Sequence, residues 1–216
     1  MKQYKVILFD MDGTLADTDP MLVETFNILY DRYKGGNRRP PEEIYYFSGP
    51  PIRETLTKEF PEYDLEFMFD VFHIISRKLY DTHIFPYPNE RETLLKLKEK
   101  GVKLGIVTNK MHDLTLVALK IINLEDIFDV IVGYNDVKIG KPNEEGMLKA
   151  INYFGEKIEE TLYVGDNVID LESANNAGVD CCLVSWGPRV LPNNINPTFT
   201  IKSYEELWGK TYGKDL

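Results

Sequence analysis

Four short stretches of this chain carry the polar side chains that could perform chemistry, and each one comes after a run of apolar residues. They lie at residues 10–14, 108–110, 141–142 and 165–170. Together they supply several carboxylates, a hydroxyl and lysine side chains. In an open parallel sheet, ligands bind beyond the carboxyl ends of the strands, so the four stretches are expected to meet at one rim.

The carboxylates of Asp10, Asp12 and Asp166 would repel one another strongly if the fold brought them together. Such a group ionises at low cost only when a cation sits among its members. Mg²⁺ suits this position, because it prefers hard oxygen ligands and binds through one or two carboxylates together with a phosphate. The sequence therefore predicts a magnesium site at this rim.

Thr108 and Lys141 indicate phosphate as the second ligand. Asn109, next to the Thr108 hydroxyl, is expected to cap a helix whose N-terminal N–H groups bind an anion, and the Lys141 ammonium would neutralise further negative charge. Taken singly, each stretch has a plain structural explanation as a turn, a helix cap or a charge at a helix start. The order of all four after successive strands favours a site for a divalent cation and a phosphate.

The elements that must position these residues alternate between strands and helices. Short runs rich in Val, Ile and Leu predict strands buried on both faces, at residues 6–9, 104–107, 130–132, 162–164 and 182–184. Helical spacing of apolar residues lies between them, at residues 93–100, 111–122, 147–154 and 171–177. This alternation predicts an α/β fold, a Rossmann-like parallel sheet flanked by helices on both faces.

Residues 16–85 lack this alternation of strands and helices, and their apolar spacing predicts helices near residues 22–30, 52–60 and 67–79. We interpret them as a small all-helical domain inserted after the first strand. The predicted organisation is therefore a catalytic core formed by residues 1–15 and 86–216, with a helical cap at residues 16–85.

The composition of the chain disfavours some classes of binding partner. The chain of 216 residues has a formal net charge of −10, which disfavours nucleic acid because the phosphate backbone repels an acidic protein. We find no run of about 18 apolar residues and no cleavable signal pattern, so a membrane is not expected and a cytoplasmic location follows by default. Cys181 and Cys182 are expected to be buried strand residues. A monomer and a homodimer are both compatible with the sequence.

The four stretches resemble the four motifs of the haloacid dehalogenase superfamily. The first motif is matched from Leu8 to Leu15, the second at residues 105–110, and the third by Lys141 before Pro142. The fourth, a Gly-Asp followed by a second Asp and an Ala-x-x-Ala-Gly, is matched at residues 165–178. The helical insertion and residues 49–53 resemble the phosphoglycolate phosphatase and β-phosphoglucomutase branch, although Asn89 stands where relatives often have Gly.

The resemblance implies a magnesium-dependent phosphatase that acts on a small phosphorylated metabolite. It implies that Asp10 is the nucleophile, that Asp12 moves the proton, and that Asp10, Asp166 and the backbone carbonyl of Asp12 hold the metal. Thr108, the Asn109 N–H and Lys141 are expected to bind the transferring oxygens, and Asp170 to orient metal-bound waters. Arg53 is our prediction for a substrate contact in the cap, where an exposed helix arginine is an equal alternative.

Three alternatives stay open. A phosphomutase uses the same intermediate but returns the phosphoryl group to a sugar. Within hydrolases, inorganic pyrophosphate competes with phosphoglycolate and with sugar or nucleotide monophosphates. A phospho-acceptor signalling domain also gathers Asp, Thr and Lys around magnesium, but it is disfavoured here by Asp12 and by the cap.

Overall fold

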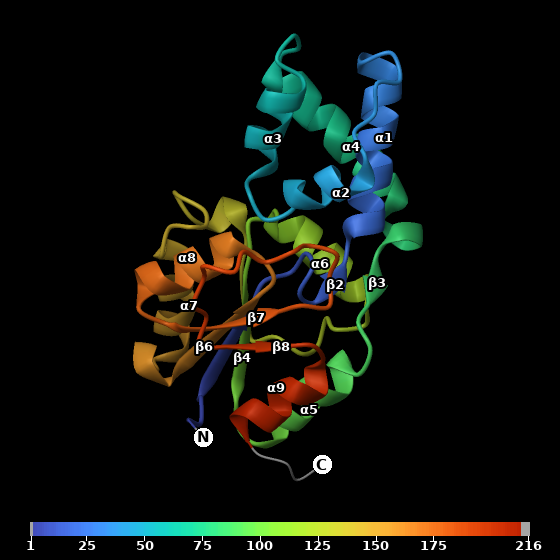
Figure 1. Ribbon diagram of the computed structural model, residues 1–216. Coiled ribbons are helices and arrows are strands. Elements are labelled where there is room, and N and C mark those ends of the chain that lie inside the picture. The colour runs from blue at the N-terminus through green and yellow to red at the C-terminus, as the bar shows by residue number, and fades with distance from the viewer. Residues whose placement is uncertain (1, 213–216) are drawn as a thin grey trace.

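The computed structural model describes residues 2–212 and contains a six-stranded sheet in which all neighbouring strands are parallel (Figure 1). The strand order is β5-β4-β1-β6-β7-β8. All five predicted strands are present, and the edge strand β8 was not predicted. The bounds are β1 (Val6–Phe9), β4 (Lys103–Val107), β5 (Val130–Val132), β6 (Thr161–Gly165), β7 (Asp180–Val184) and β8 (Phe199–Ile201).

Strand β1 lies at the centre of the sheet and is buried on both faces. Ile7 and Phe9 pack into one apolar cluster, whereas Val6 and Leu8 pack into a second cluster on the opposite face. This division follows from the two-residue period of a strand, in which successive side chains point to opposite sides. An apolar residue at all four positions is thus what a central strand between two helical layers requires.

Helices cover both faces of the sheet, so the predicted fold class is confirmed (Figure 1). Helices α5 (Glu90–Glu99), α6 (His112–Ile121) and α9 (Tyr204–Thr211) pack on the face of Ile7, and α7 (Glu145–Phe154) and α8 (Val168–Ala177) pack on the face of Val6. Two short 3₁₀ turns complete this region, η2 (Tyr134–Asp136) and η3 (Ile158–Glu160).

Four helices stand together at one end of the molecule, away from the sheet (Figure 1). They are α1 (Asp19–Tyr33), α2 (Pro41–Ile44), α3 (Ile52–Glu59) and α4 (Leu65–His83), with the 3₁₀ turn η1 (Tyr45–Phe47) after α2. We call these helices and their loops the cap. The cap has its own apolar cluster around Phe26, whose ring lies 4.8 Å from Phe47 and 5.8 Å from Phe72, centroid to centroid.

The chain enters and leaves the cap through a two-stranded antiparallel ribbon. Its strands are β2 (Ala16–Asp17) and β3 (Phe85–Pro86), and Ala16 pairs with Pro86. The predicted boundaries of the inserted domain, at residues 15–16 and 85–86, fall at this ribbon. We call it the stem, because the two connections between core and cap run side by side there.

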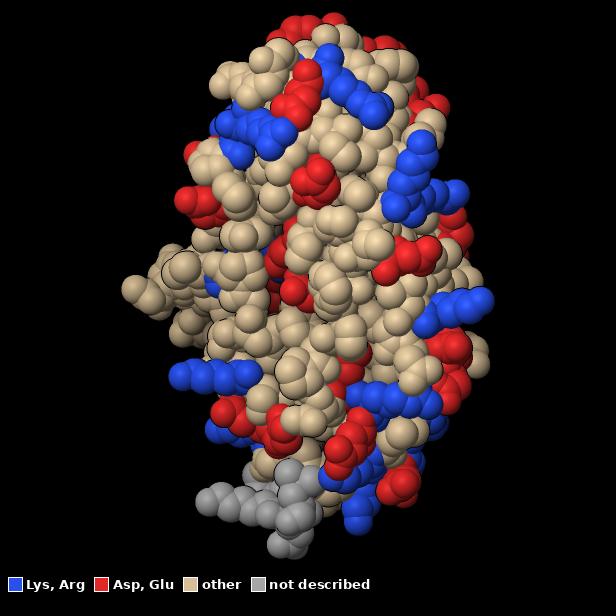
Figure 2. Space-filling view, turned by 90° about the vertical axis from the view of Figure 1, so that its right-hand side faces the viewer, with Lys and Arg blue, Asp and Glu red and all other residues tan. Residues whose placement is uncertain are grey.

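The surface carries both signs of charge. Figure 2 shows Lys and Arg side chains interspersed with Asp and Glu side chains over the face that it draws. Among the residues that the structure describes, no helix is both long enough and apolar enough to span a bilayer.

Glu90, at the start of α5, is a buried carboxyl that should make stability depend on pH. Its side chain is 2% exposed, and burial raises its pKa to about 8, although the Tyr87 N–H donates to it. Below about pH 4.5 the carboxyl is largely protonated in the folded and unfolded protein alike, so its burial carries little electrostatic penalty. As the pH rises from 4.5 toward 8, the unfolded protein loses this proton first, and the free energy of unfolding falls. We expect Glu90→Gln to raise the free energy of unfolding at pH 8 by about 2 to 4 kcal/mol, with little change at pH 4.5.

Urea unfolding of both proteins at the two pH values measures this difference, with the exposed Glu99→Gln as the control. An equal gain at both pH values, or a loss at pH 8, would contradict the role assigned to burial of the charge.

Candidate active site

The fold brings two of the three predicted carboxylates, Asp10 and Asp166, together at the carboxyl end of the sheet, where Asp170 joins them. Asp10 follows β1, and Asp166 and Asp170 follow β6 at the start of α8. One carboxylate oxygen from each lies within 4.8 Å of the others, and all three residues are buried. Asp170, for which the resemblance implied a role in orienting metal-bound waters, is thus part of the cluster.

Local structure explains how Asp166 is held. Asp170 accepts hydrogen bonds from the Asp166 N–H at 3.0 Å and the Asn167 N–H at 2.9 Å, which closes the turn between β6 and α8. On the other side, Gly13 has φ +82°, and a Cβ there would lie 2.4 Å from an Asp166 carboxylate oxygen. Glycine is therefore required at this position both by the backbone conformation and by the close approach.

Lys141 is buried inside the carboxylate cluster. Its Nζ lies 2.7 Å from Oδ1 of Asp10 and 2.7 Å from Oδ1 of Asp170, and it donates to the Tyr163 hydroxyl at 3.0 Å. The residue is 4% exposed, and attraction by Asp10 and Asp170 keeps its pKa above the ordinary lysine value despite burial. Lys141 thus offsets part of the cluster's negative charge and holds the Asp10 carboxylate. Its predicted contact with phosphate stays a prediction.

The charge balance of the cluster fits a divalent cation. Burial raises the pKa of Asp10 to about 6 and that of Asp166 to about 7, even with Lys141 and Arg189 beside them. Three carboxylates face these two cationic side chains, which leaves negative charge uncompensated in a buried place. Hard oxygen donors with an unbalanced negative charge are what Mg²⁺ requires. The residues present therefore fit the predicted metal.

Asp12 lies beside the cluster and faces the cap. Its side chain is 23% exposed and forms an ion pair with Lys110, whose Nζ lies 2.8 Å from Oδ1 of Asp12. Lys110 is itself buried, and its Nζ lies 5.2 Å from the centre of the Tyr80 ring in α4. No role was predicted for Lys110, which entered the sequence analysis only as the last residue of the stretch 108–110. A single lysine in a loop is not part of a recognisable motif.

The predicted cap of α6 by Asn109 is wrong. Helix α6 begins at His112, and residues 108–110 form the connection before it. The Asn109 amide instead donates to the Gly49 carbonyl in the cap at 2.9 Å and to the Lys141 carbonyl at 3.1 Å. Its side chain is held by these distant backbone groups, so it is unable to serve the helix. The Thr108 hydroxyl accepts from the Lys110 N–H at 3.2 Å and lines the pocket described below.

Arg189, in the segment after β7, was not predicted. Its Nε lies 2.7 Å from Asp166, and its Nη1 lies 2.7 Å from Asp19 of α1 and donates to the Tyr45 carbonyl at 2.8 Å. The side chain is buried and links the Asp166 carboxylate to the cap. Asn167 adds a second link, donating to the Ser48 carbonyl at 3.0 Å.

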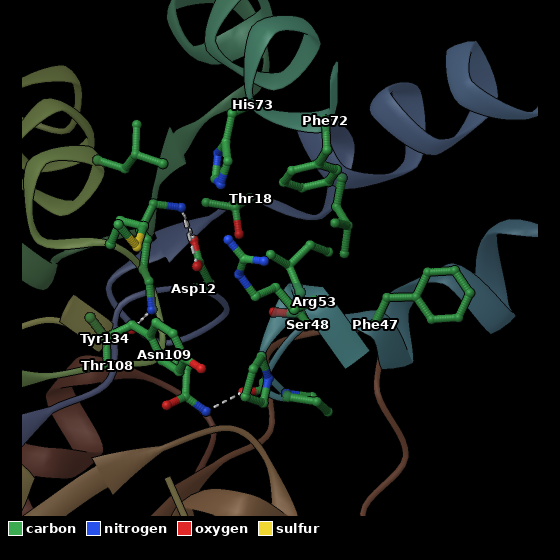
Figure 3. Close-up of a pocket in the computed structure, with 18 of the residues that line it drawn as sticks. Asp12, Thr18, Phe47, Ser48, Arg53, Phe72, His73, Thr108, Asn109 and Tyr134 are labelled. Carbon is green, nitrogen blue, oxygen red and sulfur yellow. Dashed lines mark hydrogen bonds and ion pairs between the residues drawn. The ribbon is translucent and has the colours of Figure 1, made fainter. Parts of the chain in front are cut away.

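A pocket opens between cap and core above these groups, with Asp12 and Thr108 on its core side (Figure 3). The predicted substrate contact Arg53 lies in its wall, where the guanidinium forms an ion pair with Glu66 and sits 3.9 Å from the centre of the Phe69 ring. His73 and Phe72, both from α4, also line this wall (Figure 3). The arrangement places the carboxylates of Asp10 and Asp12 beneath a largely apolar chamber.

Comparisons with known proteins agree with this site. The family model of haloacid dehalogenase-like hydrolases matches residues 7–184. Pyrophosphatase PpaX of Halalkalibacterium halodurans is 33% identical over 207 residues, covering 95% of each chain. A solved structure from Bacteroides fragilis assigned as a haloacid dehalogenase-like hydrolase has a TM-score of 0.87 and 28% identity, covering 95% of this chain and 100% of the other.

A further solved structure, from Thermotoga maritima and assigned as a β-phosphoglucomutase, has a TM-score of 0.75 and 26% identity, covering 96% of this chain and 97% of the other. The match to the family model spans most of the chain, and the 33% identity to the H. halodurans enzyme extends over 95% of each chain. The chain therefore belongs to the haloacid dehalogenase-like hydrolase family.

Proposed function

We propose that this protein is a magnesium-dependent phosphatase that hydrolyses a small phosphate monoester, phosphoglycolate being the nearest type by resemblance, through an aspartyl-phosphate on Asp10. The observation that carries the proposal is the buried cluster of Asp10, Asp166 and Asp170, of which Asp10 lines the pocket together with Asp12, two residues after it. Membership of the family supports the hydrolase class.

In the first step, a carboxylate oxygen of Asp10 bonds to phosphorus while the bond from phosphorus to the ester oxygen breaks. Asp12 gives its proton to that leaving oxygen, so the alcohol departs neutral. Lys141 holds Asp10 in the attacking orientation through their 2.7 Å ion pair. The Thr108 hydroxyl and the Asn109 N–H are proposed to bind the oxygens of the transferring group.

In the second step, Asp12 takes a proton from water, and the oxygen of that water attacks phosphorus. The bond between phosphorus and Asp10 breaks, inorganic phosphate forms, and Asp10 returns as a carboxylate. Lys110 contributes by fixing the Asp12 carboxylate at 2.8 Å. Two displacements thus share one proton carrier.

The carboxylates of Asp10 and Asp166, with the backbone carbonyl of Asp12, would hold Mg²⁺. When bound, the ion neutralises phosphate charge and shields the nucleophile from it. Asp170 holds Asp166 and Lys141 in place through its hydrogen bonds and ion pair.

Asp12→Ala should separate chemistry from binding. Removing the proton carrier is expected to lower kcat by about 10²- to 10⁴-fold. Binding of the phosphate group should be retained, because Asp12 lends no hydrogen bond that phosphate requires. Steady-state kinetics together with inhibition by inorganic phosphate measure both, with the exposed Asp31→Ala as the control. A variant that retains half of the wild-type kcat would remove Asp12 from the chemistry.

Chelation tests the metal. We expect EDTA to silence phosphate release from a panel of small phosphate esters, and excess Mg²⁺ to restore it. Mg²⁺ should also raise the thermal unfolding temperature of the wild type, because binding to the folded state stabilises it, and should do so much less for Asp166→Asn. Full activity in EDTA, with no effect of Mg²⁺ on unfolding, would exclude the metal from the proposal.

Inorganic pyrophosphatase is a second candidate function, and the observation that favours it is the 33% identity to pyrophosphatase PpaX over 95% of the chain. The chemistry at Asp10 is the same, with phosphate in place of the alcohol as the leaving group. A phosphomutase is the third possibility and is separated from both by scoring isomer formation against release of free phosphate.

A further inference from the structure

His73 presents two buried ring nitrogens to the active-site pocket. Neither Nδ1 nor Nε2 has a hydrogen-bond partner among residues 2–212. The ring packs edge-on against Phe69 at 4.4 Å and Phe72 at 5.4 Å between centroids, so two aromatic neighbours fix its position. Because an unpaired buried polar group lowers stability, such a ring within a pocket wall calls for a partner that arrives with the ligand.

The position of His73 identifies the part of the ligand that it meets. The ring projects from α4 toward Asp12 and Thr18 and lies on the opposite side of the pocket from Thr108 (Figure 3). Asp12 is the proposed proton donor to the leaving oxygen. The group that faces His73 is therefore attached to that oxygen, on the side away from the transferring phosphate.

The charge of the pocket wall disfavours a second phosphate in that place. Burial, with the positive charges of Arg77 and Lys110, lowers the pKa of His73 to about 4, so the ring is neutral at pH 7 and offers one donor and one acceptor. The cations in the wall are already paired, Arg53 with Glu66 and Lys110 with Asp12. The rest of the wall near the cap is mostly apolar: Met21, Leu22, Phe47, Pro51, Ile52, Phe69 and Phe72.

We propose, resting on the phosphatase function above, that His73 is a specificity-determining residue that hydrogen-bonds an oxygen of an organic leaving group. The substrate class is then an oxygen-bearing alkyl phosphate monoester whose carbon atoms pack on the apolar cap wall. Such esters are preferred to esters that lack the oxygen, and they are preferred to inorganic pyrophosphate.

The test compares matched substrates in matched variants. Wild type, His73→Phe and His73→Gln are assayed with glycerol 1-phosphate against propyl phosphate, with phosphoglycolate against ethyl phosphate, and with pyrophosphate. His83→Phe, near the end of the same helix and outside the pocket lining, is the control. Phenylalanine preserves the ring and its packing but removes both nitrogens, and glutamine keeps a donor and an acceptor.

For wild type, we expect kcat/KM for at least one oxygen-bearing ester to exceed that of its partner by about five- to tenfold, the effect of one neutral hydrogen bond. His73→Phe should bring that ratio to within about twofold through a higher KM, and His73→Gln should restore part of it. His83→Phe should leave the ratio as in wild type. The inhibition constant of inorganic phosphate should stay unchanged in all variants, since phosphate binds on the core side.

Two results would overturn the inference. One is a wild-type kcat/KM for pyrophosphate that equals or exceeds that of every ester; the other is a ratio that His73→Phe leaves intact. Failure of the phosphatase function itself looks different, because wild type then releases phosphate from no ester at all, whereas failure of the inference alone leaves ester hydrolysis in place and dependent on Asp10.

Discussion

Asp10→Asn is expected to lower phosphate release by at least about 10⁴-fold, the scale on which loss of a nucleophile acts in enzymes with covalent intermediates. The amide has nearly the shape of the carboxylate but lacks the charge and the basic lone pairs needed to bond to phosphorus. The fold should persist, because Lys141 keeps its 2.7 Å ion pair with Asp170.

The covalent step gives this prediction a second measurement. Wild type quenched with acid during turnover of a labelled phosphate ester should retain label on the protein, and Asp10→Asn should retain none. Asp31→Asn, an exposed carboxylate paired with Arg38 in the cap, serves as the control. Near-normal turnover by Asp10→Asn would show that the nucleophile lies elsewhere.

Lys141→Met should both destabilise the protein and inactivate it. The substitution leaves the carboxylates of Asp10 and Asp170 buried without their shared cation, a change that costs roughly 3–5 kcal/mol when one partner of a buried ion pair is removed. The same loss releases Asp10 from its orientation, so kcat should fall by about 10²-fold or more. Methionine keeps the length of the side chain, which limits the cavity.

Urea unfolding at pH 7 with Mg²⁺ present measures the loss of unfolding free energy, and phosphate release measures the loss of kcat. Lys138→Met removes an exposed lysine three residues away and should affect neither. If Lys141→Met unfolded within about 1 kcal/mol of wild type, the carboxylates would not depend on Lys141 for their charge balance.

The core of this fold could be predicted because its signals are local. Four consecutive apolar residues, Val6 to Phe9, in a chain where such runs alternate with helical patterns indicate a central strand, and the carboxyl ends of parallel strands share one edge. The meeting of Asp10 with Asp166 follows from that topology, since β1 and β6 are neighbours in the sheet. The short strand β8 at the edge lacked such a signal, because only Ile201 of its three residues is buried.

Contacts that depend on how the cap packs on the core could not be predicted from the sequence. Local sequence favours Asn109 as a helix cap, but its side chain instead donates to the carbonyl groups of Gly49 and Lys141, which lie 60 and 32 residues away along the chain. Arg189 stands in a loop with no periodicity, and its importance comes from Asp166 and Asp19, which lie far from it along the chain. Motifs locate residues on their own elements, whereas such bridges appear only once the elements are packed.

The stem has a consequence for how proteins of this construction could diversify. Because β2 and β3 run side by side, the whole insertion is attached at one place, and the sheet is completed by segments that never pass through it. A different insertion grafted at this place would have to match the spacing of those two strands and also supply partners for the core side chains that reach into the cap, Asn109, Asn167 and Arg189. The attachment is thus modular, whereas the contacts above the rim join the two parts, so the cap and those three core side chains are expected to change together.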